Sequence, residues 1–501
     1  MINKRSRRGD VKTDMRQTRY GKFIIFFAVF AFVGFLRLFY ILKQNDADNI
    51  RNNVSNITFE ELIKNINDAH KQIEKPEIDY ESYLCDITVD GMNEEQISSR
   101  ESFSITSGQM EEDVDRLFEE FRTRYGLYSF YGEDTFEEAR KKIIAECSLQ
   151  TELTNDLLAE SLLRHLSFIE DNHLFIDGRQ RSEITVSVIY EKAMFFLDKE
   201  GGVFRNLKNQ KILVSVDGDN DVKSILRPFI SDNGQIVYCP IIFQKGALGE
   251  LQSTCTMNTI CLKYTDGSEE IVETEPWSEN NILERSGRTG VSLHENAGIP
   301  VLVLNKMEDK SADLMLQYAR ALREEPILII DLRWNKGGKE DIVYRWWSTY
   351  TDSRVDTNFF TIGRKKLSLT QYGRHNMGNF KIVGEYRIST MDEVPMADNH
   401  NVVFILTSKN TASAAEIFVD IAFNVKNTVV VGENTFGVLR GNMSEKIRLE
   451  NSGIFIQFGD MLNIFPSDTY FTEGVGFQPD IWSYGKDAEE RTIKLIEYYV
   501  R

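Results

Sequence analysis

The chain has 501 residues, of which 42% are hydrophobic and 27% are charged, a composition typical of a globular protein with room for more than one domain. Its net charge of -18 argues against nucleic acid as a partner, because phosphate binding requires clustered Lys and Arg. The five cysteines show no CxxC pair and no Cys/His ligand spacing, which argues against a zinc site.

The N-terminus predicts a membrane anchor. Residues 1–22 are strongly basic and lead directly into an apolar run at residues 23–42, about as long as the ~20 residues that a spanning helix needs. The positive flank predicts a cytoplasmic tail, a single-pass signal anchor in the cell membrane, and an extracytoplasmic remainder. The alternative is a cleaved signal peptide, but the basic region is long for one and no Ala-x-Ala-like site follows.

Two regions of different character follow the anchor. Residues 43–105 are polar, with one short helix predicted at 59–66, and are interpreted as a stalk. Residues 106–182 place apolar side chains three and four residues apart, which predicts a helical subdomain.

The rest of the chain divides into a β-rich part and an α/β part. Residues 183–280 carry short alternating runs separated by Gly, Asn and Asp, which predicts strands and turns. Residues 281–501 alternate apolar strands with helices, which predicts an α/β fold with a buried, crossover-connected mixed sheet. The predicted strands of this part are 300–304, 326–332, 401–407 and 428–432, and the predicted helices are 311–324, 340–350 and 416–423.

One serine stands at a chemically useful place in the α/β part. Ser413 lies on the loop between the strand 401–407 and the helix that follows it. The first N–H groups of a helix have no intrahelical acceptor, so they can stabilise an oxyanion next to a nucleophile. The alternative is that Ser413 only caps the helix.

Five segments in order resemble the carboxyl-terminal processing (tail-specific) serine peptidases, a family that includes the tricorn core protease. The segments are DNHLFI at 171–176, DLRWNKGG at 331–338, NTASAAEIF at 410–418, VVVGENTFG at 429–437 and EGVGFQPD at 473–480. The resemblance implies a ClpP/crotonase-like core with Ser413 as the nucleophile. It also implies an oxyanion hole made by Gly337 or Gly338 together with Ala414. No metal or organic cofactor is implied.

The catalytic base departs from the better-known branch of this family. Ser–Lys members carry Lys directly after the TFG turn, where this chain has Val438. The tricorn-like branch uses serine, histidine and glutamate instead, which implies His173 as the base and Glu473 as the third member. A neutral imidazole suits this role near neutral pH, and a carboxylate orients it. His294 is the alternative base, and Glu473 is alternatively a plain loop carboxylate.

The resemblance also frames the function and its rivals. It implies a serine endopeptidase acting on peptides or unfolded proteins near the membrane, and it leaves the oligomeric state open. The β-rich part stands where many members carry a PDZ domain, so it is a degenerate PDZ-like domain or an unrelated β insert. The rival function is an inactive scaffold that binds peptides or proteins at the cell surface. A Ser–Lys enzyme with a relocated lysine is a further alternative.

Overall fold

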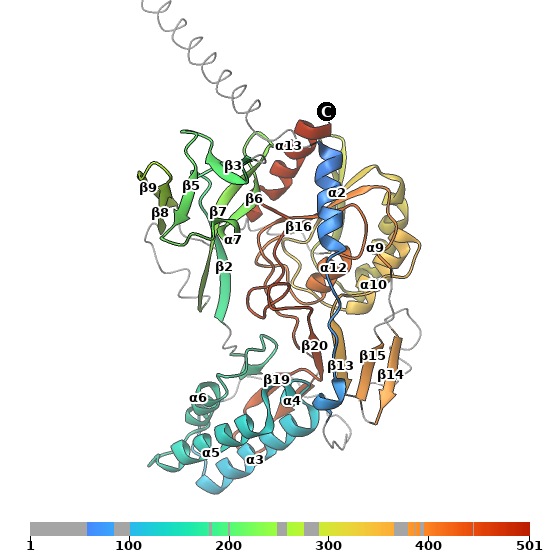
Figure 1. Cartoon of the computed structure of the whole chain (residues 1–501). Coiled ribbons are helices and arrows are strands. Elements are labelled where there is room, and N and C mark those ends of the chain that lie inside the picture. The colour runs from blue at the N-terminus through green and yellow to red at the C-terminus, as the bar shows by residue number, and fades with distance from the viewer. Residues whose placement is uncertain are drawn as a thin grey trace, which may run out of the picture. The chain divides into compact units, whose positions relative to one another are not determined.

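The structure is a computed structural model (Figure 1). It describes residues 58–84, 101–179, 183–198, 201–247, 258–274, 290–364, 379–384, 386–390, 395–443 and 445–500. The predicted anchor at 23–42 lies outside these residues. Among the helices that the structure describes, none is both long and apolar enough to cross a membrane.

The chain separates into two compact units. The smaller one contains residues 1–56 and Phe195–Ile212, and its described part holds the antiparallel strands β3 (Phe195–Asp198) and β4 (Val203–Asn206). The larger unit contains Ile57–Met194 and Leu213–Arg501. All further elements belong to this larger unit.

A large mixed sheet forms the centre of the larger unit, which confirms the predicted α/β class. Its strands run in the spatial order β10, β11, β12, β16, β17, β21, β6 and β7, and β2 pairs with β7. The strands from β11 to β6 are parallel, whereas β10, β7 and β2 pair antiparallel to their neighbours. The bounds are β10 Val291–Asn296, β11 Ile299–Leu304, β12 Ile327–Asp331, β16 Val402–Thr407, β17 Thr428–Gly432, β21 Ile481–Trp482, β6 Leu226–Ile230, β7 Ile236–Ala247 and β2 Glu183–Ile189.

Helices cover both faces of the parallel strands, as crossover connections require. Leu302, Ile330 and Ile405 pack on one face against the helices α9 (Asp309–Ala321), α10 (Glu340–Thr351) and α12 (Ala414–Ala422). The alternate strand residues Val303, Ile329 and Phe404 face the helices α2 (Phe59–His70) and α13 (Ala488–Val500). Because strand side chains alternate between faces, both faces are apolar and the strands are buried.

A helical subdomain packs on strands from the far end of the sequence. Its helices are α3 (Ser107–Arg124), α4 (Tyr128–Tyr131), α5 (Glu133–Ser148) and α6 (Asn155–His165). Their apolar stripes share one core with Leu449, Ile456 and Phe458. The strand β19 (Phe455–Phe458) pairs with β1 (Phe175–Ile176) and β18 (Glu445–Arg448), so this core brings the DNHLFI segment near the C-terminal part of the chain.

Smaller elements complete the unit. The strands β5 (Leu213–Val216), β8 (Asn258–Tyr264) and β9 (Glu269–Thr274) form one sheet, with α7 (Val222–Ile225) next to it. A second sheet has the order β14 (Asn379–Val383), β15 (Tyr386–Thr390), β13 (Phe360–Arg364) and β20 (Met461–Ile464). The short 3₁₀ turns are Tyr80–Tyr83, Leu322–Glu324 and Gly485–Asp487.

The structure differs from the predicted layout in two places. The helix of the segment interpreted as a stalk, α2, buries Leu62, Ile63 and Ile66 on the sheet and is part of the core. The strands β2, β6 and β7 of the segment interpreted as an insert extend the central sheet through β21, so only β5, β8 and β9 form a separate sheet. In both places the tertiary partner lies hundreds of residues away, which local patterns do not reveal.

Candidate active site

Ser413 sits on a strained turn between β16 and α12. Its backbone has φ 54° and ψ -121°, a region that residues other than glycine rarely adopt and that concentrates at functional sites. Its side chain is half-buried. Two hydrogen bonds join the segment before Ser413 to the segment that follows β12. The Thr411 hydroxyl donates to the Leu332 carbonyl at 2.9 Å, and the Ser408 hydroxyl donates to the Arg333 carbonyl at 2.6 Å.

A buried carboxylate ties this turn to the next loop. Glu416 accepts hydrogen bonds from the N–H of Ser413 (2.9 Å), the hydroxyl of Thr435 (2.6 Å), and the N–H groups of Gly437 (2.8 Å) and Val438 (2.9 Å). Burial raises the pKa of Glu416, and these hydrogen bonds oppose the rise. Sequence reasoning assigned Glu416 no role, although its spacing from Ser413 is that of a capping box.

Of the three N–H groups predicted for the oxyanion hole, one already donates a hydrogen bond within the protein and two do not. Gly337 has φ +96° and lies so close to the serine turn that a Cβ there would stand 2.8 Å from the Ser413 Cβ. Its own N–H donates to the Asn335 side chain at 2.9 Å. Within the described part of the chain, the N–H groups of Gly338 and Ala414 have no protein acceptor. Gly338 and Ala414 also line one cleft with Ser413, so they are the suitable donors.

That cleft is large enough for part of a substrate. Its volume is about 480 Å³, within the range of roughly 300–1,000 Å³ found for ligand pockets. Ile417, Leu439 and Met461 supply apolar walls, and Gly338, Ser413 and Ala414 supply polar groups. The arrangement places a serine and two free donors at one open surface.

His173 lies on a buried turn next to this region. Its N–H donates to Asp171 at 2.9 Å, and its side chain is 5% exposed. Its Nδ1 has no hydrogen-bond partner and lies 3.9 Å from Asp171 Oδ1. Burial lowers the pKa of His173 to about 4, so the ring is neutral at neutral pH. Across the described residues, its ring makes no hydrogen bond with Ser413 or Glu473.

Glu473 holds the backbone around His173 rather than its ring. The carboxylate accepts from the N–H groups of Asn172 (3.0 Å), Leu439 (3.2 Å) and Arg440 (2.9 Å). Burial and the neighbouring Asp171 raise the pKa of Glu473 to about 8. Asn172 also donates to the Gly437 carbonyl at 2.8 Å. The segment 437–440 therefore connects the serine turn, through Glu416, with the histidine turn, through Glu473.

A buried lysine that sequence reasoning missed braces the same loops. Lys409 Nζ donates to the carbonyls of Thr435 (2.8 Å) and of Phe436, Gly474 and Val475 (3.0 Å each). Burial lowers the pKa of Lys409 to about 7, and the carboxylates nearby oppose this change. Because the ammonium group of Lys409 is hydrogen-bonded to four carbonyls, Lys409 stabilises these loops and is not the relocated base of a Ser–Lys enzyme.

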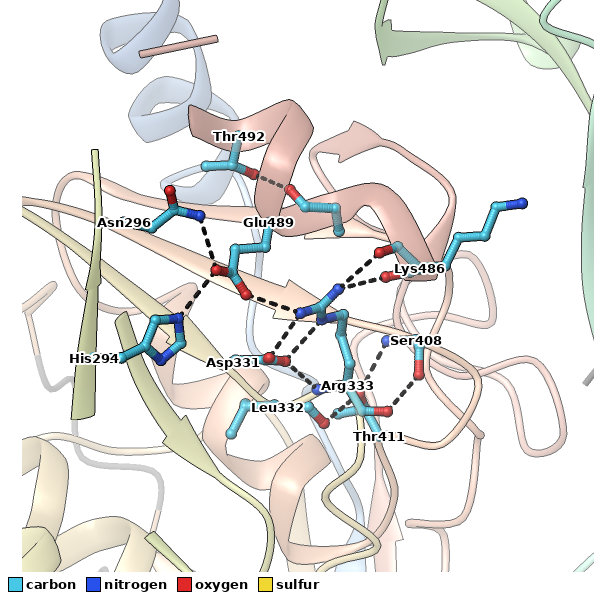
Figure 2. Close-up of polar contacts among 12 residues, drawn as sticks. His294, Asn296, Asp331, Leu332, Arg333, Ser408, Thr411, Lys486, Glu489 and Thr492 are labelled. Carbon is cyan, nitrogen blue, oxygen red and sulfur yellow. Dashed lines mark hydrogen bonds and ion pairs between the residues drawn. The ribbon is translucent and has the colours of Figure 1, made fainter. Parts of the chain in front are cut away.

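The DLRWNKGG segment is anchored on its far side by a polar network. Figure 2 shows Arg333 between Asp331, which it binds at 2.9 and 2.8 Å, and Glu489 at 3.3 Å. His294, the alternative base, binds Glu489 at 3.1 Å and does not line the cleft. This network fixes the loop that carries Gly337 and Gly338. His294 takes part in this network through Glu489, which is a structural role and not that of the catalytic base.

The fold and this site define the class of a serine hydrolase with an α/β sheet. Residues 298–483 match the sequence model of peptidase family S41. This match confirms the predicted resemblance to the carboxyl-terminal processing peptidases and supports a serine peptidase. The match spans the strands and loops that carry Gly338, Ser413 and Glu473, whereas His173 lies outside it.

Solved structures show weaker likenesses. The chain is similar to mature CPAF at 14% identity, with 79% of this chain and 96% of that chain covered and a TM-score of 0.42. It is similar to the photosystem II D1 C-terminal processing protease at 13% identity, with 77% and 94% covered and a TM-score of 0.35. For the tricorn protease the values are 14% identity, 79% and 37% covered, and a TM-score of 0.33.

Proposed function

We propose that the chain is a membrane-anchored serine endopeptidase that cleaves peptides or unfolded proteins through an acyl-enzyme on Ser413. The observation that carries the proposal is that the strained Ser413 turn shares one cleft with the free N–H groups of Gly338 and Ala414. A nucleophile next to preorganised donors is the arrangement that acyl transfer requires.

His173 is the proposed base. Its neutral imidazole is able to accept a proton, and its Nδ1 has no other partner. Its turn borders the cleft, because a Cβ at the cleft residue Gly441 would stand 3.1 Å from both carboxylate oxygens of Asp171. A movement of this turn toward Ser413 when substrate binds would complete the pair, since catalytic hydrogen bonds often tighten only in the complex.

The proposed reaction has two acyl-transfer steps. Ser413 Oγ attacks the peptide carbonyl while its proton passes to His173, and the developing oxyanion accepts hydrogen bonds from Gly338 and Ala414. The C–N bond then breaks, and the imidazolium gives its proton to the leaving amine. Water, deprotonated by the same imidazole, attacks the ester carbonyl. The C–Oγ bond breaks, the imidazolium returns its proton to Ser413 Oγ, and the carboxylate product leaves. Glu473 positions the histidine turn through the Asn172 N–H.

A fluorophosphonate probe on the full-length chain tests this function. We expect mass mapping to find the label on Ser413, and we expect Ser413→Ala and His173→Ala to abolish it. The exposed Ser353 and His400 supply controls, since Ser353→Ala and His400→Ala should keep full labelling. A folded chain that neither takes the label nor cleaves an unfolded protein is not a peptidase of this kind.

The membrane anchor is a separate part of the proposal, supported by the basic residues 1–22 and the apolar run 23–42. We expect the full-length chain to stay in the membrane pellet after alkaline carbonate extraction, and a chain beginning at Asn45 to leave it. Intact N-terminal residues in the purified chain would support a signal anchor. A mature N-terminus just after residue 42 would instead indicate a cleaved signal peptide.

A scaffold function is the second candidate, and one observation favours it. Among the residues that the structure describes, the His173 ring makes no hydrogen bond with Ser413 or Glu473. A scaffold would bind an unfolded protein without cleaving it, and Ser413→Ala would leave this binding unchanged.

A further inference from the structure

Glu340 is a carboxylate of the cleft for which the mechanism has no use. It is the first residue of α10 and lines the same cleft as Ser413. Its side chain is half-buried. Over the described part of the chain, its carboxylate has no hydrogen bond and no ion pair, whereas buried carboxylates are normally paired. An unpaired carboxylate at a substrate cleft is available to a ligand.

The other polar side chains of the cleft are already engaged. Lys339 binds Asp309 at 2.5 Å, and Asp341 stands 3.7 Å from Arg345. The amide of Asn442 binds Asp460 at 2.9 Å, and the amide of Asn463 binds the Leu439 carbonyl at 2.7 Å. Glu340 is therefore the charged group of this cleft that remains for a substrate to contact.

The negative charge of Glu340 is only partly balanced by the charged side chains around it. Burial raises the pKa of Glu340 to about 7, Arg387 opposes the rise, and Asp460 and Asp341 add to it. Arg387 itself donates to the Met461 sulfur at 3.4 Å. A substrate cation that reaches Glu340 would stabilise the ionised carboxylate.

The walls of the cleft indicate the shape of that cation. Ile417, Leu439 and Met461 line the cleft together with Glu340. A long side chain with an apolar stem and a charged end matches this combination, because Lys and Arg bury their stems on apolar surface and place the charge at the end. A neutral apolar side chain would fill the walls and leave Glu340 unpaired.

We propose that Glu340 makes the cleft selective for peptides that place a Lys or Arg side chain beside Ser413. This inference rests on the proposed peptidase function and names its substrate class. Glu340 is a specificity residue in this scheme and takes no part in bond breaking.

A peptide library with Arg, Lys, Met or Glu at each position tests the preference on the full-length chain. We expect cleavage at a fixed distance from Arg or Lys, with kcat/KM about tenfold or more above that of the Met peptide, the size expected of a hydrogen bond between charged groups. Glu340→Gln should remove the Arg-over-Met ratio and keep cleavage of the Met peptide. Glu450→Gln, which neutralises an exposed carboxylate outside the cleft, is the control and should keep the ratio.

A binding measurement decides the inference even if the chain does not cleave. In a Ser413→Ala background, fluorescence anisotropy would compare a hexapeptide with a central Arg against the same peptide with Met. We expect tighter binding of the Arg peptide, with a ratio that grows from about pH 6 to about pH 8 as Glu340 ionises, and no such growth in Ser413→Ala/Glu340→Gln. Equal binding of both peptides, or an unchanged ratio in the Gln variant, overturns the inference. Failure of Ser413 to react with fluorophosphonate overturns the proposed function instead.

Discussion

Gly337→Ala is the substitution that most directly tests the geometry of the serine turn. The new Cβ would stand 2.8 Å from the Ala412 carbonyl oxygen and from the Ser413 Cβ, and 3.0 Å from the Ala414 N. Ordinary contacts begin near 3.4 Å, so the loops must separate by about 0.6 Å. Catalytic groups tolerate roughly 0.5 Å of displacement, and about 1 Å costs on the order of 10²-fold. We therefore expect the fluorophosphonate labelling rate of Ser413 to fall on the order of tenfold.

Gly267→Ala is the control that separates strain from collision. Gly267 has φ +81°, close to the +96° of Gly337, but a Cβ there would meet nothing within 4 Å. Both substitutions should cost about 1–2 kcal/mol for the left-handed backbone, measured by urea unfolding of the full-length chain. Only Gly337→Ala should slow labelling. A folded Gly337→Ala chain that reacts at the normal rate would refute the placement of Gly337 against the serine turn.

Other predictions concern the buried charges that hold the site. Glu416→Gln leaves two of four donors without an acceptor and should cost about 2–6 kcal/mol in urea unfolding, whereas the exposed Glu450→Gln should cost nothing measurable. Lys409→Met removes the donor of the Thr435 and Phe436 carbonyls and should cost about 2–6 kcal/mol, whereas the exposed Lys446→Met should cost nothing measurable. The pKa of His173 is about 4 in the folded chain and about 6.5 when unfolded, so the unfolded chain binds more protons between these values. The free energy of unfolding should therefore fall by about 3 kcal/mol as the pH falls from 6.5 to 4, and His173→Gln should lack this part of the loss. The same pKa predicts that Ser413 labelling declines only as the pH approaches 4, and a decline centred near 6.5 would contradict it.

The α/β core was predictable because its signals are local. Apolar runs and turn residues placed β12 and β17 within about a residue of their bounds, and the helix 340–350 corresponds to α10 at Glu340–Thr351. The serine turn was recognisable because a strand, a short loop and a helix follow one another directly. These features depend on residues that are neighbours in sequence, where periodicity and turn chemistry are informative.

The features that the sequence did not predict depend on contacts between residues that lie far apart in the sequence. Nothing near Leu62 or Ile66 indicates that α2 packs on the central sheet, because amphipathic helices look alike whatever they cover. Lys409 resembles a surface lysine in the sequence, and only the folded chain brings four carbonyls to its ammonium group. Gly337 and Gly338 were equivalent in the sequence, and the hydrogen bond from Gly337 to Asn335 distinguishes them.

The segment 437–440 explains how the site tolerates Val438 in the place of a lysine. The Val438 side chain is 6% exposed, and its N–H donates to Glu416, so this position contributes apolar packing and one backbone donor. On its other side the segment donates two N–H groups to Glu473, which also accepts from the N–H before His173. The segment is therefore hydrogen-bonded to two buried carboxylates, and through them it connects the serine turn with the histidine turn. Val438 offers no proton acceptor, so the proposed mechanism needs a base from another segment, and the turn to which 437–440 is bound carries the neutral His173.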